Sequence, residues 1–169
     1  ARIKTPILVL HPQAENFVEL IERCLEPSLY SLKILQRFLE VAKNQNQTNY
    51  PVHIKFNTGL NRLGFCENDI DYLKEQLPNQ TGIKVVSLFS HLAASEDLNE
   101  KKFTKAQINT FIKITKTFDE KLHLSPFTHL LNTSGIINYP EAQFDMVRSG
   151  IGLYGFGNEA AIDAQLKPM

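Results

Sequence analysis

The fold is decided by the stretch VHIKFNTGLNRLGF (residues 52–65). Its first six residues alternate in polarity and favour β-structure, which predicts a strand over 52–57. The next eight residues contain two glycines and are typical of a loop. Lys55 lies in this strand and Arg62 lies in the loop that follows it, so two cations are expected near the carboxyl end of the strand.

Strands and helices alternate on both sides of this stretch, as short apolar runs and segments of helical spacing show. The predicted strands are 7–10, 28–30, 52–57, 84–91, 128–132 and 144–151, and the predicted helices are 14–24, 32–41, 70–77 (closed by Pro78) and 102–121. Alternation at about 30 residues per unit favours a parallel sheet covered by helices.

Two architectures fit this alternation, a doubly wound open sheet and a (β/α)8 barrel. The 169 residues are enough for one domain with a sizeable core. A complete barrel usually needs about 250 residues, so six strands would form about three quarters of one. The pattern of strands and helices leaves both architectures open.

The composition argues against several classes of function. Lys plus Arg and Asp plus Glu both number 18, so net charge gives no case for binding nucleic acid or an anionic membrane. We find no apolar run long enough to span a bilayer and no signal peptide. The two cysteines, Cys24 and Cys66, fit a reducing cytoplasm and exclude a zinc cluster built on cysteine pairs.

Polar residues that could take part in catalysis or binding follow the ends of the predicted strands, where α/β proteins gather functional groups. They are Ser90-His91, Asn132-Thr133-Ser134-Gly135 and Arg148-Ser149-Gly150-Ile151. Each alone has an ordinary structural explanation, such as a turn or a surface ion pair. The pattern G-x-G-x-x-G over 150–155 does not indicate a dinucleotide site, because only 14 residues follow it and no helix and acidic partner are predicted there.

Taken together, these segments resemble the alanine racemase family. Residues 53–65 resemble the family segment HLKvDTGMgRLGf, and residues 144–155 (FDMVRSGIGLYG) resemble fDmvRpGialYG. Residues 90–93 (SHLA) and 132–134 (NTS) are similar to sHfA and NSA. The resemblance implies a partial (β/α)8 TIM barrel of fold type III, about strands 3 to 8, over residues 1–155. Residues 156–169 would begin a linker toward a C-terminal β domain.

The resemblance implies that the barrel binds pyridoxal 5'-phosphate. Arg148 matches the arginine at the pyridine nitrogen, where a permanently charged guanidinium keeps that nitrogen unprotonated. His91 matches a histidine that holds this arginine in place, and Arg62 matches the arginine near the phenolic oxygen. Lys55 matches a lysine that is carbamylated in many members, a reaction that burial favours because only a neutral amine reacts with carbon dioxide.

The phosphate cradle is implied by the same resemblance. Thr133 stands where the family has a phosphate-binding serine, next to Asn132, and the backbone N–H groups of Gly150 and Ile151 complete the cradle. The departures from the family pattern are mild; they are Asn57, Leu60, Asn61, Thr133 and Ser134.

Both proton-transfer bases of the family are absent from these 169 residues. No segment resembles VKANAYGHG, which carries the cofactor lysine, and the tyrosine of the C-terminal β domain is missing; Tyr154 belongs to the last barrel motif. We therefore expect the isolated chain to be inactive, since racemisation needs a base on each face of the substrate.

The resemblance implies that a larger cytoplasmic, homodimeric enzyme interconverts L-alanine and D-alanine for peptidoglycan synthesis. It implies no metal, nucleic-acid partner or membrane partner. Three alternatives stay open: another fold-type III enzyme (a different racemase or a decarboxylase), a non-enzymatic barrel that binds pyridoxal phosphate, and a structural fragment without activity.

Overall fold

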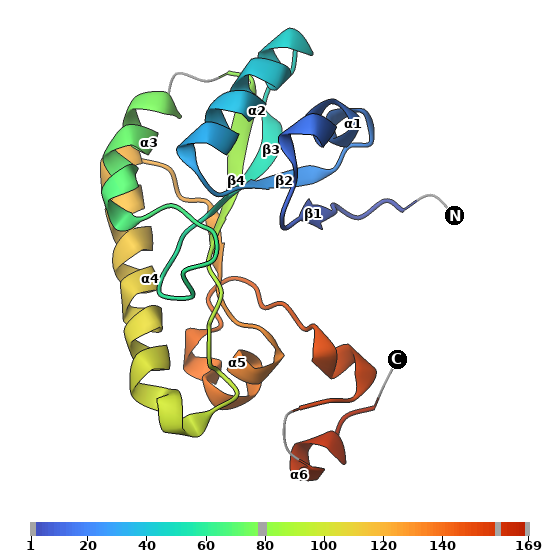
Figure 1. The fold of residues 1–169 in the computed structure, drawn as a ribbon, viewed down its shortest axis with the longest axis vertical. Helices are drawn as coiled ribbons and strands as arrows, with labels where there is room; N and C mark the ends of the chain where they lie inside the picture. The colour runs from blue at the N-terminus through green and yellow to red at the C-terminus, as the bar shows by residue number, and fades with distance from the viewer. Residues whose placement is uncertain (1–2, 78–80, 158–159, 168–169) are drawn as a thin grey trace.

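A computed structural model describes residues 3–77, 81–157 and 160–167 (Figure 1). Its centre is a five-stranded sheet with the order β1-β2-β3-β4-β5, in which every neighbouring pair is parallel. The strands are β1 (Leu8–Val9), β2 (Glu26–Leu29), β3 (Tyr50–Lys55), β4 (Ile83–Phe89) and β5 (Phe127–His129). A sheet whose spatial order follows the chain is that of a (β/α) barrel, because a doubly wound sheet reverses its order at a switch point.

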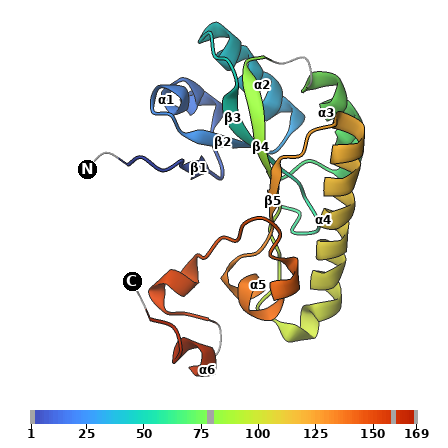
Figure 2. The ribbon, with the colours of Figure 1, turned by 180° about the vertical axis from the view of Figure 1, so that it is seen from behind.

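Helices connect the strands and cover the outside of the sheet, and α3 and α4 run side by side along it (Figures 1 and 2). The helices are α1 (Phe17–Glu22), α2 (Leu32–Asn44), α3 (Ile70–Gln76), α4 (Lys101–Leu122), α5 (Thr133–Asn138) and α6 (Ala160–Asp163). Short 3-10 turns are η1 (Ala14–Asn16), η2 (Glu67–Asp69), η3 (Leu98–Glu100), η4 (Pro140–Ala142) and η5 (Ile151–Tyr154). No helix among the described ranges is long and apolar enough to cross a membrane.

Strand alternation separates an apolar core from a polar barrel interior. Val52 and Ile54 of β3 pack with Phe38 of α2 and Phe118 of α4 in the main core, where all four side chains are inaccessible to solvent. Because successive side chains of a strand point to opposite faces, His53 and Lys55 face the other side. These polar residues are nevertheless buried, so they must find partners inside the barrel.

Helix α2 shows how local sequence sets these boundaries. The Ser31 hydroxyl accepts a hydrogen bond from the Ile34 amide at 3.3 Å and caps the first turn. Leu35, Phe38 and Val41 follow at helical spacing and are buried against the sheet. The predicted helix over 32–41 is therefore confirmed, extended to Asn44. Pro78, expected to close the third predicted helix, lies outside the described residues.

The prediction of a strand over 144–151 is wrong. That segment forms a single bridge, between Met146 and His129, and then turns into η5. Phe144 has a φ of 51°, and the Asp145 carboxylate accepts hydrogen bonds from the amide and hydroxyl of Thr128 at 2.7 and 2.8 Å. Since a side chain occupies the donors of β5 at this point, a regular ladder cannot continue there.

The short helix α5 was not expected. The pattern Asn132-Thr-Ser-Gly135 is compatible with a simple turn, but the Asn132 Oδ1 accepts from the Gly135 amide at 2.9 Å and caps this helix. Helix and turn share this first hydrogen bond, so the pattern alone does not distinguish them. The buried residues of the helix are Thr133, Ser134 and Gly135.

The loop after β3 folds back onto the end of the strand. The Phe65 amide donates to the Lys55 carbonyl at 2.8 Å, and the Asn57 amide donates to the Phe65 carbonyl at 2.9 Å. Gly64 makes this close return possible, because its φ is 140° and a Cβ there would lie 2.5 Å from the Asn57 amide nitrogen. The return of the loop places Arg62 over the carboxyl end of the sheet.

Replacing Gly64 by alanine is expected to lower the free energy of unfolding by about 1–3 kcal/mol, because the new methyl overlaps backbone atoms at a positive φ. Urea denaturation of the chain measures this. The matched control is Gly82→Ala, whose Cβ meets its nearest neighbour at an ordinary 3.5 Å. Equal stability of the two variants would contradict the role of Gly64.

Candidate functional site

A cavity of about 690 Å³ opens at the carboxyl ends of the strands. It is lined by Leu10, His11, Lys55, Arg62, Leu63, Phe89, His91, Asn132, Arg148, Ser149 and Gly150. Six of the predicted site residues therefore meet there, although they come from segments nearly one hundred positions apart. None of the lining residues is acidic, whereas three are Lys or Arg, so the cavity suits an anionic ligand.

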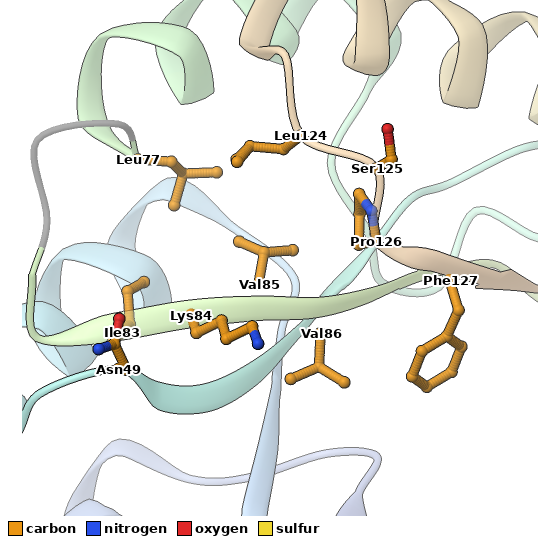
Figure 3. A pocket seen from close by; sticks show the side chains of 10 residues that line it. All are labelled: Asn49, Leu77, Ile83, Lys84, Val85, Val86, Leu124, Ser125, Pro126 and Phe127. Atoms are coloured by element: carbon orange, nitrogen blue, oxygen red, sulfur yellow. The ribbon is translucent and has the colours of Figure 1, made fainter.

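A second hollow, of about 570 Å³, lies at the amino ends of β4 and β5 (Figure 3). Leu77, Val85 and Leu124 point toward one another in it, and Lys84 is the only charged residue among the described residues that line it. Active sites of (β/α) barrels form at the carboxyl ends of the strands. This hollow lies at the opposite ends, where residues of a barrel contribute to stability.

Arg148 is the centre of the carboxyl-end cavity. Its Nη2 donates to the carbonyls of Ser90 at 2.8 Å and Leu130 at 3.1 Å, and its Nη1 donates to His129 Nδ1. The guanidinium carbon lies 5.5 Å from the centroid of the Phe89 ring. Within the described residues Arg148 has no carboxylate partner. Burial lowers the pKa of Arg148 to about 10, which still leaves it charged at neutral pH.

His91 was predicted to hold this arginine, and the structure places its Nδ1 3.4 Å from Arg148 Nη2, the longest of the Arg148 contacts. The closer histidine is His129, which sequence reasoning missed. His129 is fully buried, and its ring stacks on Phe89 at a centroid distance of 4.9 Å. A histidine within a predicted apolar strand, over residues 128–132, was the signal that could have identified it.

Burial and nearby positive charges keep these histidines neutral. Burial, followed by the charge of Arg148, lowers the pKa of His91 to about 4 and that of His129 to about 3. A neutral imidazole has a nitrogen lone pair, so it can accept a hydrogen bond from a guanidinium.

Lys55 and Arg62 add positive charge to the same cavity. Lys55 is 5% exposed, and its Nζ lies 5.9 Å from the centroid of the Phe89 ring. Burial, together with the charges of Arg62 and Arg148, lowers the pKa of the Lys55 amine. Arg62 lies at the rim with an exposed side chain.

Thr133 and two backbone amides form a compact polar group beside the cavity. The Thr133 hydroxyl accepts hydrogen bonds from the amides of Gly150 at 3.0 Å and Gly152 at 3.1 Å. Ile151, predicted to contribute its amide, lies between them. Gly152 was not predicted, but a Cβ there would lie 2.9 Å from Thr133 Cγ2. The glycine pattern over 150–155 was the available signal. It reflects the close approach of Thr133 to the backbone of Gly152 and does not indicate a dinucleotide site.

Asn132 is fixed by its neighbours. Its Oδ1 accepts from Ser95 Oγ at 2.8 Å, in addition to the Gly135 amide at the start of α5. Asn132 thus lines the cavity with its side chain held rigidly.

Acidification from pH 7 to pH 5 is expected to lower the free energy of unfolding. An unfolded histidine binds a proton near pH 6.5, whereas folded His129 does so only near pH 3, so the unfolded state takes up more protons in this window. His129 alone contributes up to about 1.4 kcal/mol per pH unit. Urea denaturation at several pH values measures the slope of the free energy of unfolding against pH. His129→Gln should reduce this slope by the equivalent of one bound proton. An unchanged slope in that variant would show that His129 is protonated in the folded state.

The chain matches the family model for "Alanine racemase, N-terminal domain" over residues 1–157. The alanine racemase of Treponema denticola is 33% identical over 175 residues, which cover 100% of this chain and 46% of that protein. The alanine racemase of Thermodesulfovibrio yellowstonii is 37% identical over 164 residues, which cover 96% of this chain and 42% of that protein.

The solved alanine racemase of Clostridium difficile 630 superposes with a TM-score of 0.87 at 27% identity, covering 98% of this chain and 43% of that one. The chain therefore spans less than half the length of these relatives. Both the match to the family model and the shared barrel show that this chain belongs to the alanine racemase N-terminal domain family.

Proposed function

We propose that this chain is the cofactor-binding barrel of an alanine racemase that uses pyridoxal 5'-phosphate. The observation that carries the proposal is Arg148, a guanidinium held by two carbonyls and a neutral imidazole, with no carboxylate partner in the part of the chain that the structure describes. Such a group presents N–H donors and a permanent positive charge, so it favours an acceptor nitrogen that stays unprotonated. Bound pyridoxal phosphate supplies the electron sink that makes the α-proton of an amino acid labile.

The residues of the cavity fit this group. Arg62 and Arg148 provide positive charge, to which Lys55 adds while its amine is protonated, and none of the described lining residues is acidic. The amides of Gly150 and Gly152 donate to the Thr133 oxygen and fix its position, so the Thr133 O–H and the amide of Ile151 would be left to donate to the phosphate. His91 and Asn132 complete the wall around the ring. Arg148 would act at the pyridine nitrogen and Arg62 at the phenolic oxygen.

The substrate and the assembly belong to the same proposal. L-alanine and D-alanine are the substrates that the family suggests, and a homodimer would supply the second base from the partner subunit. We place the enzyme in the cytoplasm, in the synthesis of D-alanine for peptidoglycan. Residues 156–169 would lead toward the C-terminal β domain.

The test is a racemisation assay of the complete protein that contains this chain, with pyridoxal phosphate and L-alanine. D-alanine is expected to form, and Arg148→Gln is expected to lower the rate at least 100-fold, because the electrostatic control of the cofactor is lost. The exposed Arg37, which pairs with Glu40 at 2.9 Å, gives the matched control Arg37→Gln with unchanged rate. Full activity of Arg148→Gln, or no D-alanine from the complete protein, would refute the proposal. The isolated chain is expected to be inactive.

We also propose that Lys55 is carbamylated. Its buried amine has a lowered pKa and no carboxylate partner among the described residues, so the neutral amine can attack carbon dioxide, with release of one proton. The resulting anion would offset the charge of Arg62. Carbon-13 NMR of the chain in labelled bicarbonate is expected to show one carbamate signal that Lys55→Met removes and the exposed-site variant Lys84→Met keeps. A spectrum without a carbamate signal at neutral pH would disprove the modification.

A further inference from the structure

A chain of hydrogen bonds crosses the barrel interior from Glu26 to Arg148. Glu26 Oε2 lies 2.8 Å from His53 Nε2, and His53 Nδ1 lies 2.6 Å from Ser87 Oγ. Ser87 Oγ lies 3.0 Å from His129 Nε2, and His129 Nδ1 contacts Arg148 Nη1. The first four residues come from the adjacent strands β2, β3, β4 and β5 (Figure 2), so the hydrogen-bond chain crosses four of the five strands and ends at the cavity.

The register of the sheet brings the members of this hydrogen-bond chain together. His53 pairs with Ser87 across β3 and β4, and Ser87 pairs with Phe127 across β4 and β5, two residues before His129. The register shift between Val52 and His53 brings Ser87 opposite His53. The contacts therefore follow from strand geometry and not from the freedom of surface side chains.

Donors and acceptors in the chain admit one direction when both histidines are neutral. A guanidinium can only donate, so His129 Nδ1 accepts and its Nε2–H donates to Ser87 Oγ. The Ser87 hydroxyl then donates to His53 Nδ1. His53 Nε2–H donates to the Glu26 carboxylate, which can only accept. The three middle groups, His53, Ser87 and His129, thus each donate one proton and accept one, while Arg148 only donates and Glu26 only accepts.

The burial of these groups makes the direction matter. Ser87 and His129 are inaccessible to solvent, and the side chains of His53 and Glu26 are 4% and 15% exposed. A tautomer of His129 with a proton on Nδ1 would face the guanidinium donor with a second donor, and an unpaired buried donor is unfavourable.

Ser87, His53 and Glu26 also have the residue types of a nucleophilic triad, but their surroundings exclude that role. Ser87 is fully buried and does not line the cavity. Its oxygen is already occupied by His129. No substrate can therefore reach this hydroxyl, which leaves a positioning role.

We propose that Glu26 is a remote positioning residue for Arg148, which fixes the tautomers of His53 and His129 through Ser87. The carboxylate at one end can only accept and the guanidinium at the other can only donate, so Glu26 reinforces through Ser87 the tautomer of His129 that leaves a lone pair on Nδ1 for Arg148. The consequence for catalysis rests on the proposed function: Arg148 is held with its remaining N–H groups free to meet an acceptor in the cavity.

The test is nitrogen-15 NMR of the histidine rings in the labelled chain at pH 7.5, with no cofactor added. Long-range proton–nitrogen correlations are expected to show a protonated Nε2 and an unprotonated Nδ1 for both His53 and His129. A protonated Nδ1 on either ring of the wild-type chain would overturn the proposal. This first measurement needs no substitution, so it decides even if a variant fails to fold.

Two substitutions then test the coupling along the chain. Ser87→Ala and Glu26→Leu are expected to shift His129 toward a mixture of tautomers. The matched control is Ser28→Ala, whose hydroxyl is equally buried in the same sheet but donates to the Leu10 carbonyl at 2.6 Å. Its His129 signals should match those of the wild type. Unchanged His129 signals in both Ser87→Ala and Glu26→Leu would overturn the link to Glu26.

Activity separates this proposal from the proposed function. In the complete protein, Glu26→Leu is expected to lower kcat by up to about 100-fold with little change in KM, because a displaced Arg148 spoils orientation. If the complete protein forms no D-alanine but the tautomers are as stated, the proposed function fails and the hydrogen-bond chain stands. If D-alanine forms and wild-type His129 carries its proton on Nδ1, the reverse holds.

Discussion

The placement of the Arg148 guanidinium is the constraint on which the rest of the structure depends. A partly buried cation without a carboxylate needs other acceptors, and it finds them in the carbonyls of Ser90 and Leu130 and in the ring of His129. These groups follow or end neighbouring strands, so they converge only when β4 and β5 pair in register. The position of one side chain at the cavity is thus a direct consequence of sheet assembly.

The interior of the sheet is polar for the same reason. Parallel strands covered on both faces are usually hydrophobic throughout, yet β3, β4 and β5 carry His53, Ser87 and His129 on the inner face. The cost of burying these groups is offset because they satisfy one another's hydrogen bonds. The opposite face, with residues such as Ile54, supplies the apolar core. The two faces of the same strands therefore have different roles: one packs in the apolar core, and the other carries the polar network that leads to the cavity.

Periodicity predicted the parallel sheet and the helices α1, α2, α3 and α4, because those features depend on patterns within each segment. The prediction of a strand over 144–151 was wrong because the Asp145 carboxylate accepts the hydrogen bonds that Thr128 donates. His129 was missed because its partners come from other strands, and Gly152 because its requirement is the approach of Thr133. Contacts between distant segments leave no signal in a single sequence, whereas the resemblance to a family located six cavity residues directly.

The charges of the cavity couple ligand binding to proton uptake. The cations Lys55, Arg62 and Arg148 lie together, and their repulsion contributes to the lowered pKa values of Lys55 and His91. An anion bound among them would favour the protonated forms of both groups, so their pKa values would rise on binding. By linkage, protons and anionic ligand then assist each other's binding. Carbamylation of Lys55 would weaken this coupling, because it replaces one cation by an anion within the same cavity.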